Sequence, residues 1–254
     1  MEQPIASASQ PVALLKARTE FPPIFIAHGM GGSVAELSGL VEFIRSAQPV
    51  YGLEARGNDG FEEPFDRIED LAQYHLDAIR KIQPAGPYSL IGYSLGGLVM
   101  LEVAQRLVAN NEEIGLLALL DSYPHRSHLS VGQRVRLTAR RVRSFSRLSI
   151  FRAFASEGDS SSSEKMPDAI RNAYERAHLA WTRYEPRFYP GKIRFVRAAV
   201  TTIFPEDPSA VWGSLAESIE VETVPGDHHG MLTKHFKALG AALTRYLAIG
   251  NHPV

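Results

Sequence analysis

The sequence predicts an α/β fold, with a mostly parallel central sheet that is flanked by helices. Short apolar runs, typical of buried strands, recur along the chain, and segments with helical spacing of apolar residues lie between them. Repetition of strand, helix and strand places neighbouring strands parallel and covers both faces of the sheet. The strands are expected at 23–27, 49–52, 88–92, 115–120, 193–197 and 219–224.

Each expected strand is a short run dominated by β-branched, leucine or aromatic residues. The helices between the early strands are expected at roughly 33–46, 69–83 and 95–110. Their apolar residues recur at the three- and four-residue spacing of a buried helix face. In the second helix these residues are Ile68, Leu71, Ala72, Ile79 and Ile82.

The alternation stops after Asp121 for about seventy residues, which is far longer than an ordinary connection. This segment contains an arginine-rich stretch, a serine run at 158–163 and a second helical pattern around 168–184. A connection of this length is normally functional. We therefore expect a single α/β domain over residues 1–254, with a helical lid inserted at approximately 122–188.

Composition excludes several classes of protein. The 254 residues are 44% hydrophobic and 22% charged, which is ordinary for a globular domain. The absence of cysteine excludes disulfides, thiolate metal sites and a cysteine nucleophile, and it is typical of a reducing compartment. A formal net charge of -1 argues against general nucleic-acid binding. Met1–Gln10 shows no leader pattern and no run of about 18 apolar residues occurs, so we expect a cytoplasmic protein without a membrane span.

The strongest chemical signal is the run Gly92–Gly97, which reads Gly-Tyr-Ser-Leu-Gly-Gly. It follows an expected strand and opens an expected helix, which is the context of a nucleophile elbow in an α/β-hydrolase fold. Glycines on either side of the serine permit a sharp turn that lifts the hydroxyl above the carboxyl edge of the sheet. Ser94 is therefore the candidate nucleophile.

A serine hydroxyl needs a histidine that takes its proton and a carboxylate that orients the histidine. His228 lies after the last expected strand and before the last helical pattern, where the base of this fold belongs, and we prefer it to the adjacent His229. His75 falls on an apolar helix face and is interpreted as a core residue, whereas His235 is expected on a helix surface. The acid is either Asp121, at the end of a strand, or one of Glu206 and Asp207 after the next strand; spacing does not decide between them.

The glycine-rich turn 28–33 follows the first expected strand. Its free backbone N–H groups can point into the site, so Met30 and Leu95 are the candidate donors of an oxyanion hole. His28 is expected to hydrogen-bond within this turn. A phosphate-binding loop is excluded because no Lys-Ser or Lys-Thr follows the glycines.

The chain resembles the thioesterase domains of nonribosomal peptide synthetases and polyketide synthases. The resemblance is carried by the His-Gly-x-Gly-Gly turn, the elbow and four further segments, while the lid shows no clear match. It implies Asp121 as the acid and His228, directly after Gly-Asp, as the base. The further segments are 50–57 with Asp59-Gly60, Gly86-Pro87-Tyr88, Leu120-Asp121-Ser122, and Gly226-Asp227-His228 before Met231-Leu232.

The resemblance implies a serine thioesterase that takes an acyl or peptidyl chain from a phosphopantetheine thioester, on a carrier protein or coenzyme A. The acyl-serine is then released to water or to an internal nucleophile, and neither a metal nor a cofactor is needed. A carboxylesterase or lipase-like hydrolase, a non-catalytic binding protein of the same fold, and an acyltransferase or cyclase remain open. A free-standing enzyme and a domain of a longer synthetase remain open too, as does the oligomeric state.

One segment, 122–156, contains eight of the 27 lysines and arginines and neither Asp nor Glu. We weigh a solvated charged lid face, contact with an acidic carrier protein or pantetheine phosphate, and binding to anionic lipid. The apolar residues Val131, Val135, Val142, Phe145 and Leu148 fall near one face of the expected helix. The arginines are Arg126, Arg134, Arg136, Arg140, Arg141, Arg143, Arg147 and Arg152.

Overall fold

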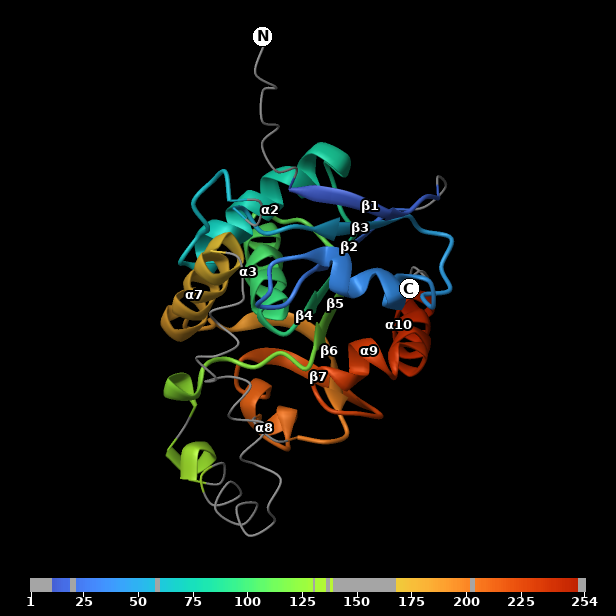
Figure 1. The fold of residues 1–254 in the computed structure, drawn as a ribbon. Helices are drawn as coiled ribbons and strands as arrows, with labels where there is room; N and C mark the ends of the chain where they lie inside the picture. Colours follow the sequence, from blue (N-terminus) through green and yellow to red (C-terminus); the bar gives the residue numbers. More distant parts are fainter. Residues whose placement is uncertain are drawn as a thin grey trace.

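A computed structural model describes residues 11–18, 22–57, 60–129, 131–135, 138, 168–201 and 204–250. In this part of the chain, seven strands form one sheet in the order β1-β3-β2-β4-β5-β6-β7 (Figure 1). Neighbouring strands are parallel except β1, which pairs antiparallel with β3 at one edge. The strands are β1 Val12–Lys16, β2 Ile24–Ala27, β3 Val50–Leu53, β4 Tyr88–Tyr93, β5 Ile114–Leu120, β6 Tyr189–Ala198 and β7 Ala216–Val224.

The predicted α/β class with a mostly parallel sheet is confirmed, and two details of the sheet differ from the expectation. β1 was not expected; as an edge strand it has a single neighbour and is only partly buried, so its apolar pattern is weak. β6 begins at Tyr189, because Tyr189 already pairs with Ala216 of β7. The chain therefore enters the sheet earlier than its continuous apolar run suggests.

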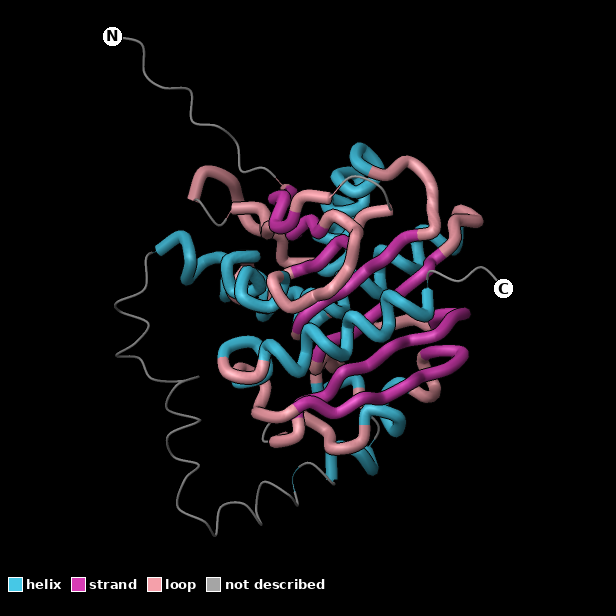
Figure 2. Tube along the Cα trace, turned by 90° about the vertical axis from the view of Figure 1, so that its right-hand side faces the viewer, coloured by secondary structure: helices cyan, strands magenta, loops and turns pink. Residues whose placement is uncertain are grey.

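Helices cover both faces of the sheet, as the tube in Figure 2 shows, and each face has its own apolar core. The two long helices α2 and α3 pack against one face, while α10 packs against the other. One face carries α2 Ile68–Ile82, α3 Leu95–Ala109 and α8 Pro208–Trp212. The other carries η1 Val34–Leu37, α1 Ser38–Val41, α9 Gly230–Thr233 and α10 Phe236–Gly250.

The helix expected at 33–46 is much shorter than predicted. The chain makes a 3-10 turn, η1, and a single α-helical turn, α1, and leaves the helix after Val41. Its apolar residues Leu37, Leu40 and Ile44 are nevertheless fully buried, as a helical face requires. Gly39 in the middle of the segment weakens the helix, because glycine loses the most backbone entropy on helix formation.

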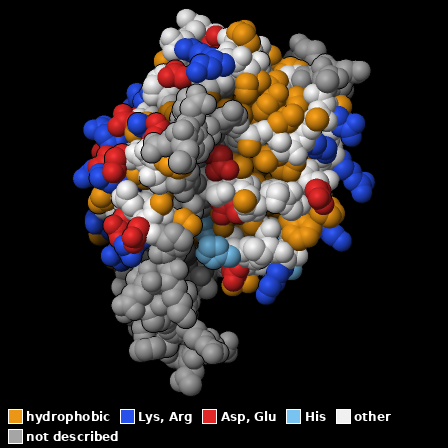
Figure 3. All heavy atoms as spheres, turned by 45° about the horizontal axis from the view of Figure 1, so that its top comes forward, with side chains coloured by type: hydrophobic (Ala, Val, Ile, Leu, Met, Phe, Trp, Pro, Cys, Tyr) orange, Lys and Arg blue, Asp and Glu red, His pale blue; other side chains and the backbone are white. Residues whose placement is uncertain are grey.

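Helix α7, Asp168–Arg183, belongs to the long connection between β5 and β6 and contains the second helical pattern of the sequence. Arg176 lies 3.6 Å from both Glu63 and Asp66, and Arg183 lies 2.7 Å from Asp66. Figure 3 shows acidic and basic side chains interleaved along one flank of the molecule. These ion pairs and the buried Ala173 hold α7 against the loop that precedes α2.

The start of the same connection is tied to α7 and α8 by the two tryptophans. The Trp181 indole N–H donates to the carbonyl of Tyr123 at 3.0 Å, and that of Trp212 donates to the carbonyl of Ser122 at 3.1 Å. Residues 131–135 are helical, and Val131 and Val135 are exposed. The rest of the expected helix face, Val142, Phe145 and Leu148, lies outside the described residues. Six of the eight arginines also lie outside them.

Among the described residues, we find no helix that is both long and apolar enough to span a membrane.

Candidate active site

Ser94 occupies a strained turn between β4 and α3. Its backbone has φ +52° and ψ -118°, a conformation that L-residues adopt rarely and at an energetic cost. The turn is held because the Ser94 N–H donates to the carbonyl of Leu120 at 2.9 Å and the Ser94 carbonyl accepts from the N–H of Gly97 at 3.1 Å. The hydroxyl therefore stands at the carboxyl edge of the sheet, at the N-terminus of α3.

The glycines of the elbow allow backbones to approach closely. A Cβ at Gly92 would collide with the carbonyl of Gly96, and a Cβ at Gly96 would collide with the carbonyl of His28. The second contact brings the elbow directly against the turn 28–33. The glycines of the elbow thus allow it to pack against the turn 28–33, and they also permit the strained conformation of Ser94.

Gly96→Ala is expected to lower the free energy of unfolding by about 3 kcal/mol, because the rigid backbone at His28 must move to admit the methyl group. Thermal and denaturant unfolding would measure the loss. Gly39→Ala is the matched control, since nothing lies within 4 Å of a Cβ there. Equal stability of the Gly96 and Gly39 variants would contradict this account of the elbow.

His228 lies in the loop between β7 and α9, and its ring reaches both Ser94 and Asp121. Its Nδ1 is 2.8 Å from Asp121 Oδ2, and its Nε2 is 3.0 Å from Ser94 Oγ. A carboxylate only accepts hydrogen bonds, so Nδ1 carries the hydrogen and Nε2 is left to accept from the serine hydroxyl. The loop makes this turn at Gly226, whose φ is +94°.

Asp121 is the acid that the structure brings to His228. It is 1% exposed and has a positive φ of +47°. Its N–H donates to the carbonyl of Val196 at 2.8 Å, and its Oδ1 accepts from the N–H of Ala198 at 3.2 Å. These bonds to β6 leave Oδ2 for the imidazole, so the carboxylate has a single orientation.

The alternative acids and histidines lie elsewhere in the structure. Asp207 caps the N-terminus of α8 by accepting from the N–H of Ser209 at 2.9 Å. His229 is exposed and meets the edge of the His228 ring. His75 is fully buried, as expected for a core residue. The expectation for His235 is wrong: it precedes α10 and is half-buried, because it packs beside Gly226.

Aromatic rings that the sequence analysis did not single out surround His228. Tyr93 stacks on the imidazole with ring centroids 4.8 Å apart, and its hydroxyl donates to the His228 carbonyl at 2.9 Å. Phe204 meets the imidazole edge to face at 5.0 Å. Tyr93 stands inside the elbow motif, which is the one sequence signal that pointed toward it. Phe204 carries no such signal, because only the tertiary fold brings it near the site.

The Gly29 carbonyl stabilises the glycine-rich turn by accepting two hydrogen bonds. His28 Nδ1 donates to the carbonyl of Gly29 at 2.5 Å, as expected, and the N–H of Gly32 donates to the same carbonyl at 3.2 Å. Burial lowers the pKa of His28 to about 4, so its imidazole is neutral at neutral pH. Met30 and Leu95, the candidate oxyanion donors, line one small pocket together with His28 and α7.

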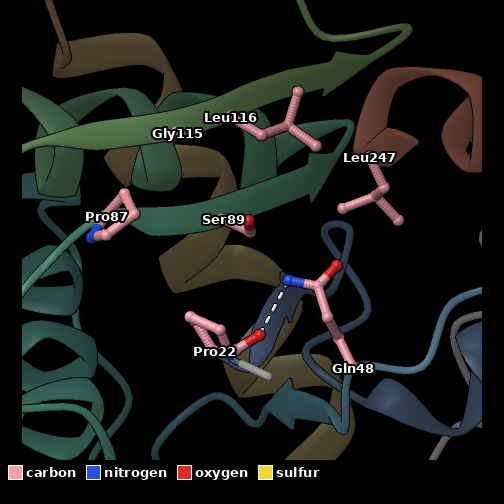
Figure 4. A pocket seen from close by; sticks show the side chains of 7 residues that line it. All are labelled: Pro22, Gln48, Pro87, Ser89, Gly115, Leu116 and Leu247. Atoms are coloured by element: carbon pink, nitrogen blue, oxygen red, sulfur yellow. Dashed lines mark hydrogen bonds between the residues drawn. The ribbon is translucent and has the colours of Figure 1, made fainter. Parts of the chain in front are cut away.

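A second small cavity, drawn in Figure 4, lies at the opposite end of the strands, beside the start of β4. Gln48 is directed toward its rim and donates from Nε2 to the carbonyl of Pro22 at 2.7 Å. With a volume of about 20 Å³, this cavity has room for about one water molecule. Its lining contains none of Ser94, Asp121 and His228, so the candidate functional site lies at the other end of the strands.

Among the described residues, no group of three or more His, Cys, Asp or Glu side chains is arranged to hold a metal ion.

The fold and the site together define a class. The sheet is mostly parallel, and the serine lies on a strand-to-helix turn. An acid and then a histidine follow it in the chain, the histidine contacts the serine, and the acid contacts the histidine. These features define a serine hydrolase of the α/β-hydrolase fold. The chain belongs to the thioesterase domain family, whose model matches residues 22–245. The family resemblance seen in the sequence is thereby confirmed.

Known proteins similar to this chain include long peptide synthetases. It is 40% identical over 124 residues to the nonribosomal peptide synthetase pngA of Aspergillus terreus (strain NIH 2624 / FGSC A1156), a match that covers 48% of this chain and 13% of that protein. It is 42% identical over 114 residues to a dimodular nonribosomal peptide synthase of Bacillus subtilis (strain 168), covering 44% of this chain and 5% of that protein. The matches thus span a small part of these relatives.

Solved structures show the same fold. The NocB thioesterase domain, in covalent complex with a fluorophosphonate nocardicin G analog, superposes with a TM-score of 0.67 at 21% identity, covering 90% of this chain and 95% of that chain. The four-domain nonribosomal peptide synthetase AB3403 superposes with a TM-score of 0.72 at 18% identity, covering 97% of this chain and 20% of that chain.

Proposed function

We propose that the chain is a serine thioesterase in which Ser94 is the nucleophile, His228 the general base and Asp121 the orienting acid. The observation that carries this proposal is the unbroken chain of two hydrogen bonds from Ser94 Oγ through His228 to Asp121. Membership of the thioesterase domain family supports the reaction class. No step of the reaction requires a metal or a cofactor.

The reaction proceeds in two halves. In the first, Ser94 Oγ attacks the thioester carbonyl while His228 Nε2 takes its proton, and the imidazolium then protonates the departing thiolate to the free thiol. In the second, His228 takes a proton from water or a substrate nucleophile as it attacks the acyl-serine, and the imidazolium returns that proton to Ser94 Oγ as the acyl–oxygen bond breaks. Asp121 stabilises the imidazolium in both halves through the 2.8 Å bond to Nδ1.

The oxyanion of the tetrahedral intermediate is assigned to the N–H groups of Met30 and Leu95. The Gly29 carbonyl is held by His28 and Gly32. A peptide unit is planar and trans, so the N–H of Met30 points away from that carbonyl and has a set direction. Leu95 begins α3, where N–H groups have no partner inside the helix and the helix dipole favours negative charge.

The proposed substrate is an acyl or peptidyl chain on a phosphopantetheine thioester, presented by a carrier protein or coenzyme A. Support comes from the relatives, which are named as nonribosomal peptide synthetases. Release to water and release to an internal nucleophile both fit the mechanism. A cytoplasmic location remains part of this proposal and rests on the absence of cysteine.

We further propose that the single α/β domain carries a lid at approximately 122–188, of which α7 is the longest described helix. Ala173, Ala177 and Ala180 of α7 face Met30 and Leu95 across the small pocket. Its volume of about 20 Å³ admits about one water molecule, so an acyl chain enters this pocket only if its lining, which includes α7, shifts. The ion pairs of Arg176 and Arg183 are the contacts that such a shift must break or carry along.

An acyl-pantetheine thioester is expected to be cleaved with a kcat/KM about tenfold or more above that of the matched oxygen ester. The reason is the leaving group, since a thiol with a pKa of about 8.5 departs more readily than an alcohol. Steady-state kinetics on the pair would measure the ratio. Preference for the oxygen ester would favour a carboxylesterase, and a failure of fluorophosphonate to label Ser94 would favour a non-catalytic binding protein.

A further inference from the structure

A second carboxylate, Glu36, reaches the active site from η1. Its Oε1 accepts a hydrogen bond from the N–H of Gly29 at 2.6 Å. Glu36 as a whole is exposed, while this bond is partly buried. Gly29 is therefore hydrogen-bonded at its N–H to Glu36 and at its carbonyl to His28 and Gly32.

Glu36 and Tyr93 both pack next to Gly29, close to the imidazole of His228. A Cβ at Gly29 would meet the Tyr93 ring at 3.0 Å and Glu36 Oε1 at 3.2 Å. The same Tyr93 ring stacks on His228. The Tyr93 ring and the Glu36 carboxylate thus both lie against Gly29, and the Tyr93 ring extends this packing to the imidazole.

The groups around Glu36 act on its charge in opposite directions. Burial raises the pKa of Glu36, whereas the hydrogen bond from the Gly29 N–H and the charge of His228 lower it; Glu54 raises it further. The hydrogen bond to Gly29 thus favours the ionised carboxylate that accepts it.

We propose that Glu36 is a positioning residue for the reaction proposed above: its carboxylate fixes the Gly29 peptide, and with it the turn that carries Met30. It touches neither substrate nor the reacting atoms. Substitution tests this anchor directly, because glutamine keeps an acceptor for the Gly29 N–H, while alanine has none.

Glu36→Ala is expected to lower kcat about tenfold, with little change in KM, because the turn that carries Met30 loses its anchor. Glu36→Gln keeps an acceptor for the Gly29 N–H, so its kcat should stay within about threefold of the wild type. Glu42→Gln, an exposed change six residues further along the chain, is the matched control and is expected to behave as the wild type.

Amide hydrogen exchange of Gly29 tests the inference separately from turnover. In the Ser94→Ala background, NMR follows the exchange of the Gly29 N–H with and without Glu36→Ala. Faster exchange in the alanine variant supports the role of Glu36 even if no thioester is turned over. Unchanged exchange together with a wild-type kcat of Glu36→Ala overturns it and leaves the proposed thioesterase function intact.

Discussion

Ser94→Ala is expected to reduce kcat on an acyl-pantetheine thioester by about 10⁵- to 10⁶-fold, the loss seen when a serine nucleophile is removed from a triad. The substitution removes the atom that attacks the carbonyl and leaves the oxyanion donors in place. Residual turnover then reflects binding and the oxyanion hole alone. Single-turnover kinetics with a matched thioester would measure the loss.

The control for this variant is its stability. Alanine has the same Cβ as serine at the strained φ of +52°, and the described hydrogen bond of the Ser94 hydroxyl is the one to His228. The melting temperature should therefore stay close to that of the wild type, while labelling by a fluorophosphonate disappears. Turnover that survives in a folded Ser94→Ala protein would exclude Ser94 as the nucleophile.

Asp121→Asn is expected to lower kcat about 10⁴-fold at neutral pH. An asparagine can turn its NH₂ group toward Nδ1 while its oxygen still accepts from the N–H of Ala198, which now bonds Oδ1 at 3.2 Å. The imidazole then carries its hydrogen on Nε2 and no longer accepts from Ser94. The pH–rate profile and kcat of the variant would measure the effect.

Asp207→Asn is the matched control, because Asp207 was, with Glu206, one of the competing candidates for the acid. Asparagine caps a helix as well as aspartate does, so the bond to the N–H of Ser209 and the stability of α8 should be kept. Its kcat should stay within about twofold of the wild type. A large loss of kcat in Asp207→Asn together with a wild-type kcat in Asp121→Asn would identify Asp207 as the acid instead.

Much of the architecture was predictable because it depends on local patterns. A buried parallel strand must be apolar over its whole length, as β4 and β5 are, and a helix between sheet and solvent must alternate, as α2 does. The elbow was recognisable because a strained serine needs small neighbours at fixed spacing. These constraints act within a few residues, so they are written in the sequence.

The choice of acid shows where local patterns end. Asp121 follows one strand of the sheet and Glu206 and Asp207 follow the next, and spacing alone could not choose between these positions. In the structure, bonds to β6 direct Asp121 toward His228, whereas Asp207 caps α8. A side chain's direction depends on the backbone of neighbouring strands, which the sequence next to it does not contain.

The sequence by itself determined the α/β class, the serine at the elbow and the family. Only the tertiary structure decided that Tyr93 and Phe204 enclose His228, that Glu36 holds Gly29 and that α7 covers Met30 and Leu95. The physical reason is range. Turn and strand patterns arise from contacts between near neighbours, whereas these contacts join residues that come together only when the sheet and its helices have packed.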